Sequence, residues 1–184
     1  MTLRPDQEEV AKNLIELLRT HSVGVLMAPT GWGKSYVASF IIRQLRGRWL
    51  WASSLISALV SAAKALDDFN IRFYLSTGRE RLCLRGYSYA DFIARNPCAR
   101  CSYNMTVPKD LIRVAIMGVS NYGELKGLAE GNSICAYNLQ EESIKTLLRE
   151  YDTVAILMNY ARINKFLKYS EGLILDESHN IVLP

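Results

Sequence analysis

Two glycines, a lysine and a serine stand close together in the stretch Ala28-Pro29-Thr30-Gly31-Trp32-Gly33-Lys34-Ser35. Glycine adopts backbone angles that other residues avoid, so successive N–H groups in such a stretch can point inward at phosphate oxygens. Lys34 would then reach the β- and γ-phosphates of a nucleotide, and the Ser35 hydroxyl would bind Mg²⁺. The pattern G-x-x-x-x-G-K-[ST] is met except at its first position, where Ala28 replaces glycine. We therefore predict a phosphate-binding loop whose nucleotide contacts are Thr30, Gly31, Trp32, Gly33, Lys34 and Ser35.

A pair of acids near the end of the chain would complete such a site. Asp176 and Glu177 directly follow the apolar run 172–175. An acid at the tip of a strand beside the phosphate loop holds the Mg²⁺ ion in nucleotide-hydrolysing sheets, which assigns Asp176 to the metal. Glu177 could accept the proton of the attacking water. The alternative is a strand cap with two solvated acids, and the phosphate loop upstream favours the metal site. Lys34, Asp176 and Glu177 are thus the predicted catalytic residues.

Four cysteines form a third candidate centre. They are Cys83, Cys98, Cys101 and Cys135, and all lie in one segment without clear periodicity. Four thiolates can bind a tetrahedral zinc ion or an iron–sulfur cluster. The single close pair is compatible with zinc but does not have the commonest zinc spacing, so the residues leave both groups open. Free buried cysteines are disfavoured, because all four fall in the same irregular segment.

Arginines and aromatic residues surround these cysteines. Cations that follow a phosphate backbone and rings that stack on bases are the usual combination for single-stranded nucleic acid. The alternative is a solvated basic face over aromatics that fill a small core. As a group the set predicts DNA binding, with three residues as the best candidates: Arg79, Arg85 and Arg100.

Strands and helices must alternate to position these residues. Apolar runs at 23–27, 48–53 and 71–75 predict strands, and helical periodicity predicts helices over 5–20, 36–45 and 55–69. After the cysteine segment the alternation resumes with a helix over 142–150, a strand over 153–157, a helix over 161–169 and a strand over 172–176. The pattern indicates an α/β domain with a parallel sheet flanked by helices. The expected division is 1–78, the cysteine-bearing insertion 79–136, and the continuation of the α/β domain over 137–184.

Composition excludes some classes of protein. The 184 residues are 49% hydrophobic and 22% charged, with a net charge of +4. No apolar run has the length of a membrane span and the N-terminus does not have the form of a signal peptide, so no membrane partner is expected. We expect a cytoplasmic protein, or a nuclear one in a eukaryote. The mild basic excess permits nucleic acid without requiring it.

Several of these elements together resemble a known family. Asp176-Glu177-Ser178-His179 resembles the DEAH box of superfamily-two helicases, with serine in place of alanine. Arg4 and Gln7 match the R-x-x-Q element that such helicases use near adenine. The four cysteines after Gly78-Arg79 look like the iron–sulfur insertion of the XPD/DinG family. Cys135-Ala136-Tyr137 is similar to its Cys-Pro-Tyr element, and Asn159-Tyr160 to its Asn-Tyr pair.

The resemblance implies the first motor domain of an ATP-dependent 5′–3′ DNA helicase, with a RecA-like P-loop NTPase fold. Its cofactors would be Mg²⁺ at Ser35 and Asp176 and a [4Fe–4S] cluster at the four cysteines. Its partners would be ATP, single-stranded or forked DNA, and a second motor domain. The sequence ends at Pro184, so we expect an N-terminal half that is incomplete as a motor. The alternatives are a non-motor DNA- or helicase-binding module with a structural metal, and another P-loop ATPase with a zinc-binding insert.

Overall fold

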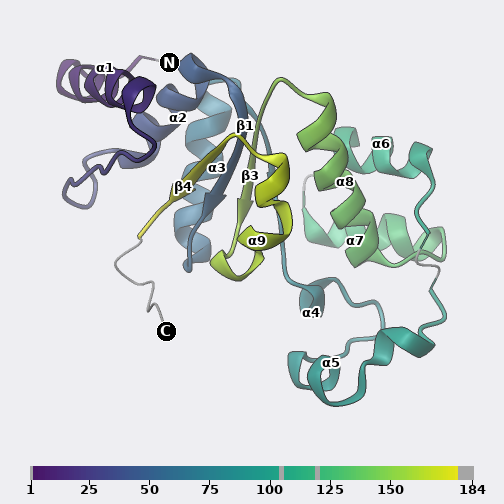
Figure 1. Cartoon of the computed structure of the whole chain (residues 1–184). Coiled ribbons are helices and arrows are strands. Elements are labelled where there is room, and N and C mark those ends of the chain that lie inside the picture. Colours follow the sequence, from purple (N-terminus) through teal and green to yellow (C-terminus); the bar gives the residue numbers. More distant parts are fainter. Residues whose placement is uncertain (1, 104–105, 119–120, 178–184) are drawn as a thin grey trace. The chain divides into compact units, whose positions relative to one another are not determined.

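The computed structural model describes residues 2–103, 106–118 and 121–177. The chain divides into two compact units. The sheet unit comprises Met1–Leu75 and Tyr151–Pro184, and the cysteine unit comprises Ser76–Glu150 (Figure 1). The cysteine unit is longer than the predicted insertion at its C-terminal end, because a helix that begins at Ala136 packs on two helices of this unit.

Among its described residues, the sheet unit contains four strands and the helices that flank them. In chain order its elements are α1 (Pro5–Thr20), α2 (Lys34–Leu45), β1 (Gly47–Ala52), α3 (Ile56–Asp68), β2 (Arg72–Leu75), β3 (Thr153–Met158), α9 (Ile163–Phe166) between the short 3₁₀ turns η2 (Tyr160–Arg162) and η3 (Leu167–Tyr169), and β4 (Gly172–Leu175). The four strands are parallel and have the order β2-β3-β1-β4. The predicted strands 48–53, 71–75, 153–157 and 172–176 are thus confirmed within a residue or two.

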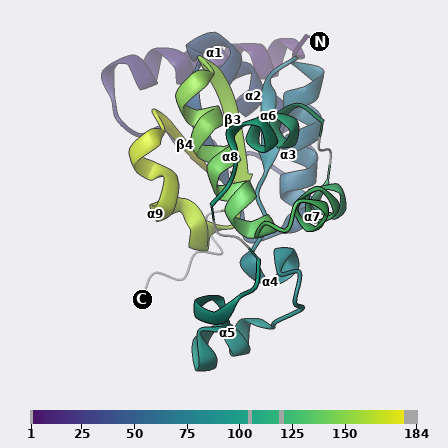
Figure 2. The same cartoon turned by 90° about the vertical axis from the view of Figure 1, so that its right-hand side faces the viewer.

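Helices cover both faces of this sheet. Helices α2 and α3 lie on one face and α9 on the other, and α1 packs on the outside of α2 (Figures 1 and 2). Residues 154–158 of β3 are completely buried, as expected for a central parallel strand. Apolar side chains of α2 and α3 meet Trp51 of β1 in the main core. The predicted parallel α/β fold is therefore present.

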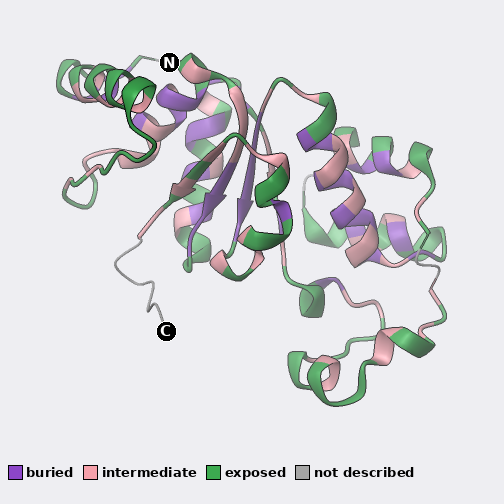
Figure 3. Ribbon diagram, viewed as in Figure 1, coloured by how far each residue is buried: buried purple, intermediate pink, exposed green. Residues whose placement is uncertain are grey.

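The predicted strand over 23–27 is absent, and this expectation was wrong. The segment has no regular secondary structure. Val23, Val25 and Met27 are 73%, 75% and 90% exposed, and Figure 3 shows the stretch as mainly exposed. Gly24 lies against Leu14 and Leu17 of α1, so the segment packs on a helix and not beside a strand. An apolar run alone does not supply the neighbouring strand with which a β-ladder forms.

The secondary-structure elements of the cysteine unit are helices, within the residues that the structure describes. Its elements are α4 (Arg79–Leu82), α5 (Tyr89–Arg95), the 3₁₀ turn η1 (Pro97–Arg100), α6 (Lys109–Gly118), α7 (Tyr122–Gly131) and α8 (Ala136–Glu150). Helix α8 packs on α6 and α7, around a core that includes Leu125, Ala129 and Leu139. Its Gln140 is buried and bonds Thr77 twice, accepting from the backbone N–H at 2.8 Å and donating to the carbonyl at 2.9 Å. None of the helices in the described part of the chain is long and apolar enough to cross a membrane.

Candidate nucleotide site and cysteine pocket

The predicted phosphate loop is a tight turn that leads directly into α2. The Trp32 N–H donates to the Pro29 carbonyl at 3.2 Å, and Gly33 forms the N-cap of the helix. Gly31 and Gly33 have φ angles of +81° and +102°, which glycine adopts far more readily than other residues. The N–H groups at the start of α2 and its dipole make this end of the helix attractive to anions. Loop and helix thus have the geometry that the glycine pattern predicts, although a strand does not precede them.

Lys34 lies across this loop. Its ammonium group donates to the carbonyl of Ala28 at 2.9 Å and to that of Pro29 at 3.4 Å. Ser35 is the next residue of α2 and is half-buried, whereas Thr30 is exposed. Lys34 is therefore held against the first two residues of the loop.

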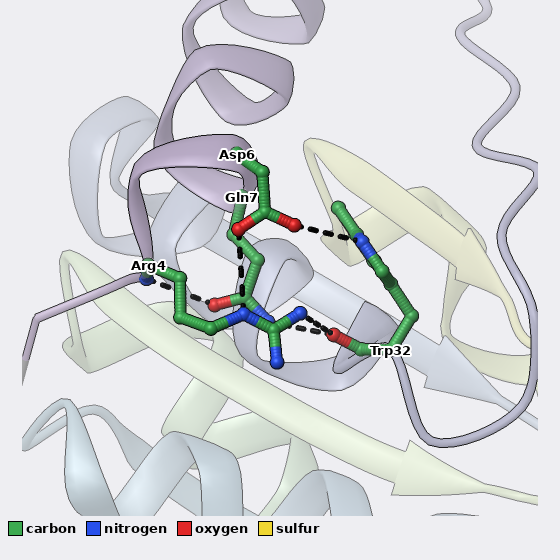
Figure 4. Close-up of polar contacts among 4 residues, drawn as sticks. All are labelled: Arg4, Asp6, Gln7 and Trp32. Atoms are coloured by element: carbon green, nitrogen blue, oxygen red, sulfur yellow. Dashed lines mark hydrogen bonds and ion pairs between the residues drawn. The ribbon is translucent and has the colours of Figure 1, made fainter.

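The start of α1 is bonded to the same loop (Figure 4). Arg4 Nη2 and Gln7 Nε2 both donate to the Trp32 carbonyl, at 2.9 Å and 2.7 Å. The Trp32 indole N–H donates to an Asp6 carboxylate oxygen at 3.0 Å. Gln7 also accepts from the Arg4 backbone N–H at 3.0 Å. The two residues that the resemblance assigns to adenine thus contact the phosphate loop, and Asp6 is a further contact that the sequence did not predict.

Asp176 follows β4 and is bonded through three of its atoms. Its backbone N–H donates to the Ala52 carbonyl at 2.9 Å, which extends the pairing of β4 with β1 by one residue. The buried Trp51 indole N–H donates to Asp176 Oδ2 at 3.4 Å. The Tyr160 hydroxyl donates to the Asp176 carbonyl. The predicted metal ligand is therefore fixed by residues from two other parts of the sheet unit.

Electrostatic interactions link Asp176 to the phosphate loop. Burial raises the pKa of the Asp176 carboxyl group, and the charge of Glu177 raises it further. The Trp51 hydrogen bond and the positive charge of Lys34 lower it. The charge of Lys34 is the contribution to this pKa that comes from the predicted phosphate loop. Glu177 is half-buried in the turn after β4, with a φ angle of +55°. The other two residues of the DEAH-like sequence, Ser178 and His179, lie outside the described residues.

The four cysteines converge on one pocket of the cysteine unit. They come from the end of α4, from η1 and the residue after it, and from the residue before α8. All four are half-buried free thiols. Burial raises the pKa of the Cys98 thiol, Arg79 lowers it, and the other three cysteines each raise it. In the described part of the chain, however, no three His, Cys, Asp or Glu residues are close enough to hold a single metal ion.

The predicted DNA-binding arginines have different surroundings. Arg79 Nη1 lies 4.0 Å from Cys98 Sγ, and its guanidinium group lies over the rings of Phe92 and Tyr137, at 5.5 Å and 4.6 Å. Arg85 donates to the Ser102 hydroxyl and lies 5.6 Å from the centre of the Tyr103 ring. Arg100 is exposed at the end of η1. Arg79 and Arg85 line the cysteine pocket itself.

Comparisons with known proteins agree on the fold. The family described as "Type III restriction enzyme, res subunit" matches residues 1–54. Among curated proteins, none matches this chain. A solved XPD helicase is similar with a TM-score of 0.70 and 23% identity, over 98% of this chain and 33% of its own. A truncated XPD is similar with a TM-score of 0.58 and 20% identity, over 94% of this chain and 52% of its own. The chain thus spans about a third and about half of these two structures. The resemblance to XPD-type helicases is confirmed for the fold: this chain has the α/β architecture of part of an XPD helicase.

Proposed function

We propose that the sheet unit binds Mg–ATP and serves as part of the first motor domain of an ATP-dependent DNA helicase. The observation that carries this proposal is the placement of Lys34 and Asp176. They belong to different elements, and the charge of one acts on the carboxyl group of the other. A cation on a phosphate loop and a carboxylate at the end of a strand of the same sheet are what a Mg–triphosphate requires.

Each predicted site residue has a role in this proposal. Lys34 and the loop N–H groups would bind the β- and γ-phosphates, and Ser35 and Asp176 would hold Mg²⁺. Glu177 would accept a proton from the attacking water. Arg4 and Gln7 would reach the adenine as well as the loop, because an amide can both donate to and accept from a base edge. A second motor domain would supply the trans-acting arginine, so this chain should hydrolyse ATP slowly by itself.

For the cysteine pocket we propose a [4Fe–4S] cluster rather than zinc. A zinc ion with Zn–S bonds of about 2.3 Å holds its four sulfurs close together, whereas each thiolate of a cubane cluster binds a different iron atom. The four thiols line one pocket, and the family resemblance favours the cluster over zinc. The cluster would cross-link α4, η1 and the start of α8. Three arginines near the cluster would contact single-stranded or forked DNA: Arg79, Arg85 and Arg100. The proposed 5′–3′ direction of movement rests on the family resemblance alone.

Calorimetric titration of the 184-residue chain with Mg–ATP tests the nucleotide site. We expect Lys34→Ala to abolish measurable binding, because the lysine is the only loop side chain with a positive charge. Lys12→Ala is the matched control, since Lys12 is an exposed α1 residue paired with Glu8. Equal binding by wild type and Lys34→Ala would refute the nucleotide site.

The visible absorption spectrum of anaerobically purified protein tests the metal. A brown protein that loses its visible absorption in Cys98→Ser supports the cluster. A colourless protein that contains one zinc ion per chain would refute it, and would favour another P-loop ATPase with a zinc-binding insert.

A further inference from the structure

We propose that Trp51 and Tyr160 are positioning residues for magnesium, and that they act by fixing the orientation of Asp176. The inference rests on the proposed function, because Asp176 matters in this way only if it binds Mg²⁺. Neither residue would touch the ion or the nucleotide.

Trp51 is suited to this role by its burial. The side chain is 1% exposed and belongs to the core formed by α2, α3 and the sheet. A buried indole ring has little rotational freedom, and its N–H group requires an acceptor. That acceptor is Asp176 Oδ2, at 3.4 Å. Because the donor is fixed by packing, it restricts the rotation of the carboxylate and thereby directs the second oxygen.

Tyr160 acts on the other end of the same residue. Its hydroxyl donates to the Asp176 carbonyl. The η2 turn that begins at Tyr160 is capped by Asn159, whose side chain accepts from the Ala161 N–H at 3.0 Å. The backbone after β4 turns immediately, since Glu177 has a positive φ angle. Tyr160 therefore holds the main chain at the point where the strand ends, while Trp51 holds the side chain.

Groups that orient a metal ligand have measurable effects. Loss of one outer hydrogen-bond partner commonly lowers metal affinity by about 10- to 100-fold. Trp51→Phe keeps an aromatic ring in the core and removes the N–H group. Tyr160→Phe removes only a hydroxyl group at a half-buried position. Both changes should weaken the magnesium-dependent part of ATP binding while leaving the loop contacts of Lys34 unchanged.

The experiment compares ATP affinity of the full chain in excess Mg²⁺ and in EDTA. The ratio of the two dissociation constants is the magnesium gain. We expect Trp51→Phe to reduce this gain about tenfold, at the low end of the range for such partners, and Tyr160→Phe to reduce it in the same direction by less. A merely structural role would weaken both affinities equally and leave the ratio unchanged. Trp49→Phe is the matched control, because its indole lies on the same strand and donates to the Arg46 carbonyl at 2.6 Å instead.

Asp176→Asn separates this inference from the proposed function. If Asp176→Asn loses the gain and both Trp51→Phe and Tyr160→Phe keep it, the positioning role is refuted and the magnesium site stands. If wild type and Asp176→Asn show the same gain, the magnesium site is refuted and the positioning role with it. In the Asp176→Asn background Trp51→Phe should have no further effect on the ratio. Tyr160→Phe decides the question if Trp51→Phe does not fold.

Discussion

Substitution of Gly33 by alanine should destabilise the sheet unit for two separable reasons. The φ angle of +102° is strained for any residue with a Cβ atom, which costs about 1–2 kcal/mol. The new Cβ would also overlap Gln7 Nε2. Gln7 is a flexible side chain and can move away, but it then loses its 2.7 Å bond to the Trp32 carbonyl. A lost hydrogen bond of this kind costs about 0.5–1.5 kcal/mol. The expected total is roughly 1.5–3.5 kcal/mol.

Gly31→Ala provides the matched control within the same loop. Gly31 also has a positive φ angle, +81°, but an added Cβ would meet no atom within 4 Å. Gly31→Ala should therefore show the backbone strain alone. The free energy of unfolding, measured by urea titration with circular dichroism, gives the difference between the two variants. We expect Gly33→Ala to lose about 0.5–1.5 kcal/mol more than Gly31→Ala, the value of the Gln7 bond.

A double variant tests whether Gln7 is the cause. A Gln7→Ala background removes the amide that the new Cβ would overlap. In that background Gly33→Ala and Gly31→Ala should therefore lower the free energy of unfolding by the same amount. Equal losses for Gly31→Ala and Gly33→Ala in the wild-type background would refute the proposed contact between α1 and the phosphate loop.

Two further predictions concern stability. Gln140→Ala should lower the free energy of unfolding by about 2 kcal/mol in a urea titration, because it removes both hydrogen bonds to Thr77 from a buried position. Gln44 is exposed, so the control variant Gln44→Ala should change the free energy of unfolding by less than about 0.5 kcal/mol. Hydrogen bonds from Arg48 lower the pKa of Glu171 below its ordinary value of 4.5. The pair therefore stabilises the fold fully above pH 4.5, and this stabilisation is lost as the pH falls through the lowered pKa. Glu171→Gln should therefore lower the melting temperature at neutral pH, and the difference from wild type should shrink in acid; a difference that persists in acid would contradict this assignment.

Periodicity was sufficient to predict most of the sheet unit. The apolar runs at β1 and β3 and the helical pattern of α3 each report burial, and burial is what places an element in a core. The apolar run at β4 also predicted its strand, although Leu173 and Leu175 are partly exposed. The same logic failed for 23–27, because an apolar run does not reveal whether a neighbouring strand will pair with it. In the structure this stretch lies along α1 and leaves Met27 exposed.

Part of the candidate site has a local sequence pattern, and the rest depends on tertiary contacts that no pattern reveals. Gly31, Gly33 and Lys34 belong to one short loop, so their spacing is readable from the sequence. Asp6 and Trp32 are 26 residues apart, and Trp51 and Asp176 are 125 residues apart. No spacing rule predicts such pairs. A tryptophan in a buried strand does carry one signal, since its N–H group must find an acceptor.

The distribution of these contacts suggests how the two halves of the nucleotide site are kept together. Helix α2 begins at Lys34 and contributes Val37 and Ile41 to the same core as Trp51. Trp51 in turn bonds Asp176, and the pairing of β1 with β4 continues to the Asp176 N–H. One packed cluster therefore connects the residue that would bind phosphate with the residue that would bind magnesium. Because interiors are closely packed and transmit strain, a change of volume in this cluster should alter the spacing of the two groups as well as the stability of the fold. Strand β1 is then the element on which both the fold and the proposed chemistry depend, although none of its residues belongs to a recognised sequence pattern.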